Sequence, residues 1–167
     1  MIAKALGAKV IGIDINSLAL KKAKEVGADI VLDPTKFNNI WQEVRELTEG
    51  GVDVSLDALG IEATFKNSLR SLRKLGRHIQ IGMPTSSNTI VSLPLLELLY
   101  SRQLKIIGTR GMAASGFSSL MTMINNGSIN IDSLITRKLK LSQVPEAMLQ
   151  FGQKSETGIT IINDFSN

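Results

Sequence analysis

The sequence contains no cysteine, only one histidine, His78, and few aromatic residues (4%). Without cysteine the chain can form neither a disulfide nor a thiolate zinc site. A metal site would depend on His78 and carboxylates, and no ligand cluster surrounds that residue in the sequence. We therefore expect no metal site in this chain.

Long apolar runs and an excess of one charge are also absent. The apolar runs are much shorter than the roughly 20 residues of a transmembrane helix, and Lys4 and Lys9 interrupt the first run, unlike a signal peptide. The net charge is +4, and the basic residues are interspersed with acidic ones. We therefore expect a cytoplasmic protein that binds neither membrane nor nucleic acid.

What the chain does contain is a repeated pattern. "AKALGAKVIGID" (3–14) is followed by the similar "AKEVGADIVLD" (23–33). In each segment a glycine, Gly7 or Gly27, is placed to end a helix, and a β-branched run follows it. Such runs lack polar alternation, which is typical of parallel strands buried on both faces.

The alternation of helix and strand continues along the chain. Helices are expected over 38–48, from Ile61 to a stop at Gly76, from Pro94 through Leu99, around 117–124 and over 142–151. Strands are expected over 52–57, 77–82, 104–108, 134–141 and 158–164, and a loop over 84–92. This order predicts an α/β fold with a doubly wound, Rossmann-like parallel sheet in a single domain.

Ligands of such sheets bind outside the carboxyl ends of the strands. Asp14 ends one of the expected strands, and a carboxylate there can bind both hydroxyls of an adenosine ribose and disfavour NADP. Alternatively, Asp14 steadies the turn before a helix that starts at Asn16 or Ser17. The dinucleotide fingerprint places its glycines about 20 residues before this acid, so we expect the first strand and the glycine-rich loop to be missing and Met1 to lie within the first helix.

Three other strand ends are candidates, each with a plain structural alternative. "DALG" (57–60) and "IGMP" (81–84) are either loops beside the cofactor or tight turns. "GTRG" (108–111) offers Arg110 for a phosphate or carboxylate, although an isolated arginine is more often a surface residue. We expect His78 to be structural, since it lies early in its expected strand, away from the ligand end.

The ordered segments together resemble the cofactor-binding domain of the zinc-dependent medium-chain alcohol dehydrogenases over essentially the whole chain. The segments that carry the resemblance are "AKALGAKVIGIDIN", "KKAKEVGAD", "GGVDVSLDALG", "GRHIQIGMP", "IIGTRG", "INNGSINIDSLITRKLKLSQVPEAM" and "TGITIIND". The resemblance implies a six-stranded NAD(H)-binding Rossmann domain. It also implies a separate catalytic domain, absent here, that supplies most of the zinc ligands. Residues 1–167 would then form one partial dinucleotide-binding domain.

The resemblance also implies which residues contact NAD. Asp14, with Ile15 beside it, matches the ribose-binding end of the site. Asp57 and Gly60 match the loop beside the adenosine and the nicotinamide ribose. The remaining matches are Ile81, Gly82 and Met83 on the nicotinamide side, and Gly108, Thr109 and Arg110 at the carboxamide. No catalytic residue and no zinc ligand is implied within this chain.

The sequence departs from the family at the missing glycine loop, at Ala19 in place of a ribose-binding lysine and at Ile159 in place of a basic residue. We therefore expect weak or lost NAD binding and no independent catalysis. Without a central first strand, the strand that ends at Asp14 would pair directly with the one at 52–57, borrow a neighbour's strand, or leave edges that oligomerise. By resemblance, a homodimer through the edge strand Leu104–Gly108 is expected.

The resulting prediction is an NAD(H)-binding fragment of a zinc-type alcohol dehydrogenase-like oxidoreductase, which moves hydride between an alcohol or carbonyl and nicotinamide in the full-length family. The alternative is a non-catalytic remnant that serves as a dimerisation or interaction module. A methyltransferase would require a reversed final strand pair and a glycine-rich first loop. A zinc-free quinone reductase would favour a small or basic residue in place of Asp14.

Overall fold

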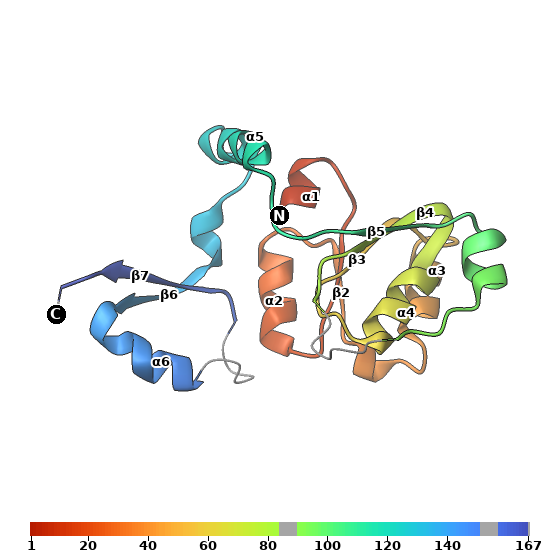
Figure 1. The fold of residues 1–167 in the computed structure, drawn as a ribbon, viewed down its shortest axis with the longest axis horizontal. Coiled ribbons are helices and arrows are strands. Elements are labelled where there is room, and N and C mark those ends of the chain that lie inside the picture. Colours follow the sequence, from red (N-terminus) through yellow and green to blue (C-terminus); the bar gives the residue numbers. More distant parts are fainter. Residues whose placement is uncertain (84–89, 151–156, 167) are drawn as a thin grey trace. The chain divides into compact units, whose positions relative to one another are not determined.

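The computed structural model describes residues 1–83, 90–150 and 157–166 (Figure 1). The chain divides into two compact units, Met1–Lys36 with Ala113–Asn167, and Phe37–Met112. All strand pairings among the described residues are parallel, and this confirms the predicted Rossmann-like α/β class. No helix in these ranges is long and apolar enough to cross a membrane.

The first unit contains two two-stranded sheets, β1–β2 and β6–β7. Its helices and strands are α1 (Ile2–Ala5), β1 (Ile11–Ile13), α2 (Ser17–Glu25), β2 (Ile30–Leu32), α5 (Ala114–Asn125), β6 (Ile135–Lys140), α6 (Val144–Gln150) and β7 (Ile159–Asp164). Single 3₁₀ turns occupy η1 (Pro34–Lys36), η3 (Ile131–Leu134) and η4 (Leu141–Gln143). The parallel β6–β7 pair contradicts the reversed final pair that a methyltransferase would have.

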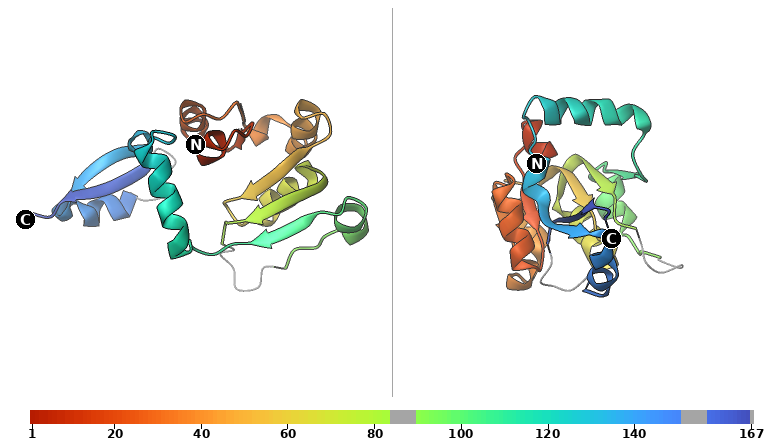
Figure 2. Two further views of the ribbon diagram at one scale, coloured as in Figure 1. Left: turned by 90° about the horizontal axis from the view of Figure 1, so that it is seen from above. Right: turned by 90° about the vertical axis from the view of Figure 1, so that its left-hand side faces the viewer.

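The second unit has a three-stranded sheet in the order β3-β4-β5 (Figure 2). Its elements are α3 (Ile40–Leu47), β3 (Val52–Asp57), α4 (Glu62–Ser71), β4 (Leu72–Gln80), the π-helical turn η2 (Leu96–Tyr100) and β5 (Lys105–Gly108). Helix α4 packs against β3, β4 and α3. The core of this unit is a cluster of buried leucines, Leu69, Leu72, Leu98 and Leu104.

The helix stop predicted at Gly76 is wrong. Helix α4 ends at Ser71, and β4 begins at Leu72, so Gly76 lies inside a strand that carries an irregularity opposite Val52–Val54. The apolar period continues through Leu72 because that side chain is fully buried at the start of the strand. Its carbonyl accepts hydrogen bonds from Arg45 and Arg102 instead of from a helical amide.

One expectation about the sheet also fails. β1 pairs with β2 in parallel, and the Val10 and Leu32 carbonyls accept amides across that pair. The first strands are not buried on both faces, since β1 has no buried residue and Ile13 is 45% exposed. A pair of three-residue strands has too few neighbours to cover two faces. The loop residues 84–89 and Phe151 lie outside the described residues.

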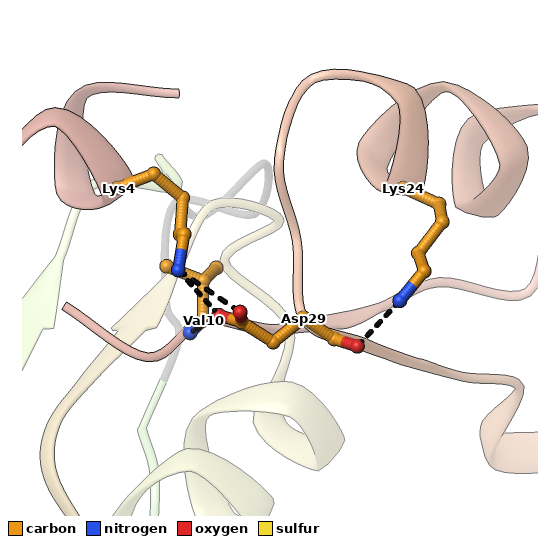
Figure 3. A network of polar contacts seen from close by, with 4 residues as sticks. All are labelled: Lys4, Val10, Lys24 and Asp29. Carbon is orange, nitrogen blue, oxygen red and sulfur yellow. Dashed lines mark hydrogen bonds and ion pairs between the residues drawn. The ribbon is translucent and has the colours of Figure 1, made fainter.

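Asp29 aligns the two strands of the β1–β2 sheet at their start (Figure 3). Its carboxylate accepts the Val10 amide at 2.7 Å and the Lys4 ammonium of α1 at 2.9 and 3.0 Å. The Lys24 ammonium of α2 donates to the Asp29 carbonyl. The Val10 amide and then Lys4 hold the pKa of Asp29 below its ordinary value. This contact ties the residue before β1 to the residue before β2, at the end of the pair opposite Asp14.

Candidate functional site

The carboxyl ends of β3, β4 and β5 meet at one edge of their sheet because the three strands are parallel. Main-chain hydrogen bonds tie the loops there together: the amides of Ile81 and Gly82 donate to the Asp57 carbonyl at 2.9 and 2.8 Å, and the Thr109 amide donates to the Gln80 carbonyl at 3.0 Å. The fold thus brings eight of the ten predicted cofactor contacts to this edge. They are Asp57, Gly60, Ile81, Gly82, Met83, Gly108, Thr109 and Arg110.

Asp57 is the most enclosed group at this edge, with 3% of its surface exposed. Its Oδ1 accepts the Leu59 and Gly60 amides at 2.9 and 3.1 Å and the Thr64 hydroxyl at 3.0 Å. Its Oδ2 accepts the Gln80 amide at 3.1 Å. Burial acts to raise the pKa of Asp57, but these hydrogen bonds, led by that of Gly60, outweigh it and lower the pKa. The carboxylate therefore organises the loop after β3.

Gly60 and Gly82 hold the loops after β3 and β4 in direct contact. A Cβ built on Gly82 would lie 2.3 Å from the Gly60 nitrogen, and one built on Gly60 would lie 2.8 Å from the Met83 carbonyl oxygen. Gly60 also has φ of +83°, which side chains disfavour. Both glycines are thus required by close backbone approach, which supports the tight-turn alternative for "DALG" and leaves a role beside a cofactor open.

The other candidates at this edge present accessible groups. The side chains of Ile81 and Met83 are 50% and 77% exposed, and Gly108, Thr109 and Arg110 are all exposed. Within the described residues Arg110 forms no ion pair, so a phosphate or carboxylate can reach it. This edge therefore offers main-chain groups, two apolar side chains and one cation.

Asp14 and Ile15 follow β1 in the other compact unit. Oδ1 of Asp14 accepts the Asn16 amide at 2.8 Å, and Asn16 in turn caps α2 by accepting the Leu18 amide at 2.9 Å. The turn-steadying alternative for Asp14 is therefore present in the structure. Asp14 is nevertheless exposed, as is Ile15 (65%), and Oδ2 accepts none of the hydrogen bonds found in the described part of the chain.

The sequence reasoning missed Gln80 and Thr64 and misplaced His78. His78 lies two residues before the carboxyl end of β4, not early in its strand, because β4 starts at Leu72. The prediction that it is structural agrees with its full burial and its two hydrogen bonds, at 2.9 Å each to Ser68 and Gln80. The contact between His78 and Gln80 could have been predicted from the sequence, because side chains alternate along a strand and residues 78 and 80 therefore lie on one face.

Zinc does not fit the described residues. Both ring nitrogens of His78 are engaged in hydrogen bonds, and no group of three histidine, aspartate or glutamate side chains in these ranges could hold a metal ion. The chain also has no cysteine. Any zinc chemistry would need ligands from outside the part of the chain described here.

Comparisons with known proteins agree with this fold. The family model described as "Zinc-binding dehydrogenase" matches residues 1–126. D-arabitol-phosphate dehydrogenase of Enterococcus avium is 34% identical over 163 residues, which are 96% of this chain and 45% of that protein. Sorbitol dehydrogenase of Halalkalibacterium halodurans is 30% identical over 149 residues, 87% of this chain and 42% of that protein. The chain spans less than half the length of these relatives.

Solved structures show the same likeness. Benzyl alcohol dehydrogenase from Acinetobacter calcoaceticus has a TM-score of 0.85 at 25% identity, covering 97% of this chain and 44% of that one. 2R,3R-butanediol dehydrogenase from Bacillus subtilis has a TM-score of 0.84 at 22% identity, covering 96% of this chain and 45% of that one. At such identity the second likeness concerns the fold alone.

Proposed function

Because the chain belongs to the zinc-binding dehydrogenase family, we propose that it is the NAD(H)-binding part of an alcohol dehydrogenase-like oxidoreductase. In a complete enzyme of this kind the nicotinamide exchanges hydride with an alcohol or carbonyl substrate. We propose that this chain alone binds the cofactor at most weakly and does not catalyse the reaction, since its described residues hold no zinc ligand set.

The observation that carries the proposal is the environment of Asp14. Its carboxylate is exposed at the carboxyl end of a parallel strand, and the Asn16 amide fixes one oxygen while the other accepts no hydrogen bond in the described residues. A carboxylate held in this way can accept both hydroxyls of a ribose and repel a 2′-phosphate. The neighbouring Ile15 side chain, 65% exposed, offers an apolar contact to an adenine ring.

The loops after β3, β4 and β5 support the nicotinamide end of the proposal. Ile81 and Met83 are exposed, as are Gly108, Thr109 and Arg110, so these residues are accessible to a nicotinamide ring and its carboxamide. The amides of Ile81, Gly82 and Thr109 already donate to main-chain carbonyls and hold the loops together. Asp57 takes no direct part in binding, because its four hydrogen bonds already engage both oxygens. The role proposed for Asp57 is to hold the Gly60 loop in place.

A fluorescence titration of the purified chain with NADH, repeated with NADPH, tests the proposal. We expect saturable NADH binding that is weaker for NADPH and lost in Asp14→Ala. Asp33→Ala is the matched control, because Asp33 ends the neighbouring strand β2 and accepts the Thr35 amide two residues on, as Asp14 accepts that of Asn16. The control should bind NADH as the unmodified chain does.

Two outcomes would contradict this function. Equal losses in Asp14→Ala and Asp33→Ala would show that turn stability, and not ribose recognition, matters. Absence of binding up to millimolar NADH would favour a non-catalytic interaction module.

We also propose a homodimer through the β5 edge. β5 pairs only with β4 among the described residues, and its Ile106 and Ile107 side chains are 40% and 42% exposed. An unpaired edge with apolar side chains favours pairing with a second copy. Analytical ultracentrifugation should show a dimer at micromolar concentration, and a monomer alone would contradict this interface.

A further inference from the structure

A continuous chain of hydrogen bonds joins helix α4 to the two loops at the carboxyl edge of the β3–β4–β5 sheet. Ser68 of α4 contacts His78 Nδ1, and His78 Nε2 contacts Gln80 Oε1, each at 2.9 Å. Gln80 Nε2 then donates to Asp57 Oδ2 at 3.1 Å and to the Gly82 carbonyl at 2.8 Å. All of these residues belong to one compact unit.

The chemistry of the partners fixes the direction of each hydrogen bond. A carbonyl cannot donate, and the lowered pKa of Asp57 keeps its carboxylate an acceptor, so the amide nitrogen of Gln80 must face both groups. The Gln80 oxygen then faces His78, and His78 must present its proton on Nε2. In the neutral ring Nδ1 is left to accept the Ser68 hydroxyl proton.

The imidazole is rigid enough to impose this arrangement. His78 is fully buried, and the Phe65 ring meets it edge to face with centroids 4.9 Å apart. If the Nε2 donor were absent, the Gln80 amide could turn over and present its oxygen to the Asp57 carboxylate, which is repulsive. The Gly82 carbonyl and Asp57 Oδ2 would lose their donor at the same time.

We propose that His78 is a positioning residue that, through Gln80, holds the loops after β3 and β4 in the arrangement that accepts the nicotinamide end of the cofactor. The Nε2 group of Gln80 donates to the Gly82 carbonyl and to Asp57 Oδ2. Oδ1 of Asp57 in turn accepts the Leu59 and Gly60 amides. The cofactor part of this inference rests on the proposed function. The positioning of the loops does not.

Two substitutions at one position separate this role from simple filling of the core. In His78→Gln the side-chain amide can place a donor near the Nε2 position, toward Gln80. In His78→Asn the shorter amide reaches only the Nδ1 position, toward Ser68. Both remove the ring, but asparagine is one methylene smaller and leaves the larger cavity at this buried position, so the His78 pair is interpreted together with a second pair. Gln80→Met and Ser68→Ala repeat the comparison without touching the ring, should the His78 variants fail to fold.

The measurements are amide hydrogen exchange at Leu59 and Gly60 by NMR, and NADH titration on the same samples. Loss of one hydrogen bond is worth about tenfold in an equilibrium constant. In His78→Asn and Gln80→Met the Leu59 and Gly60 amides should therefore exchange about tenfold faster, and the affinity for NADH should be about tenfold lower. His78→Gln and Ser68→Ala should stay within about twofold of the unmodified chain. Equal changes within either pair would overturn the inference.

The two readouts also separate this inference from the proposed function. If exchange distinguishes the variants while the unmodified chain binds no NADH, the positioning of the loops stands and the cofactor proposal fails. If NADH binds and exchange at Leu59 and Gly60 is the same in all variants, the relay through Gln80 is wrong.

Discussion

Asp14 and Asp57 are the same residue type at the same topological position, the carboxyl end of a parallel strand, yet their environments are opposite. Asp14 is exposed and accepts one local amide. Asp57 is 3% exposed and accepts four hydrogen bonds, one of them from a side chain 23 residues away. A strand-end aspartate can therefore be a group that is ready for a ligand or a group that builds the loop around one. The number of its existing partners decides between the two.

The largest effect is expected for Asp57→Ala. This change leaves four donors without their acceptor in a buried place, which should cost about 3 kcal/mol or more of the free energy of unfolding. Urea unfolding followed by far-UV circular dichroism measures it. Asp57→Asn keeps an oxygen for Leu59, Gly60 and Thr64 but turns an amide toward Gln80. The free energy of unfolding should therefore fall by less in Asp57→Asn than in Asp57→Ala. Equal losses would mean that the Gln80 contact carries most of the energy and that the three contacts of Oδ1 carry little.

A second test compares two glycines at the same sheet edge. Gly82→Ala places a Cβ 2.3 Å from the Gly60 nitrogen, whereas a Cβ at Gly108 meets nothing within 4 Å. The first change should destabilise the chain by about 2 kcal/mol through overpacking, and Gly108→Ala should change stability by less than about 0.5 kcal/mol. The same urea experiment applies. If Gly82→Ala is neutral, the two loops do not touch as described.

Much of the fold follows from local sequence signals. The bounds of β3 agree with the predicted 52–57, because Gly50-Gly51 and the acidic residue at its end delimit the run. The start of β4 could not be read in the same way. Leu72 continues the apolar period of α4 but has extended backbone angles. Its carbonyl accepts hydrogen bonds from Arg45 and Arg102, which come from distant segments that no local pattern reveals.

The candidate site could be predicted only in part, for a related reason. Parallel strands place their carboxyl ends at one edge, so the order of strands in the sequence is enough to predict that the loops after β3, β4 and β5 lie together. The environments of the aspartates depend on side chains that the fold brings in from elsewhere, such as Gln80 for Asp57. No local pattern distinguishes "GID" from "SLD" in this respect.

A smaller effect is expected from acid. The folded-state pKa of Asp57 is lowered, so its contribution to stability is present above the unfolded pKa of about 3.9. That contribution is lost as the pH falls through the folded value. The difference in unfolding free energy between the unmodified chain and Asp57→Asn should therefore narrow from pH 7 to pH 3. Asp29, Asp33 and Asp164 also have lowered pKa values, but they are common to both proteins and cancel. A constant difference would contradict the assignment.

The smallest effect on stability is expected at Asp14, and it completes the comparison. Asp14→Ala removes one exposed hydrogen bond to the Asn16 amide, while Asn16 continues to cap α2 through the Leu18 amide. The free energy of unfolding should change by less than about 0.5 kcal/mol, measured in urea beside Asp57→Ala. If Asp14 recognises a ribose, the same variant loses NADH binding, so function and stability separate at this residue. At Asp57 they should fall together, because there the carboxylate acts on a ligand only through the loop that it holds. A large loss of stability in Asp14→Ala would remove this contrast and leave Asp14 as a second structural aspartate.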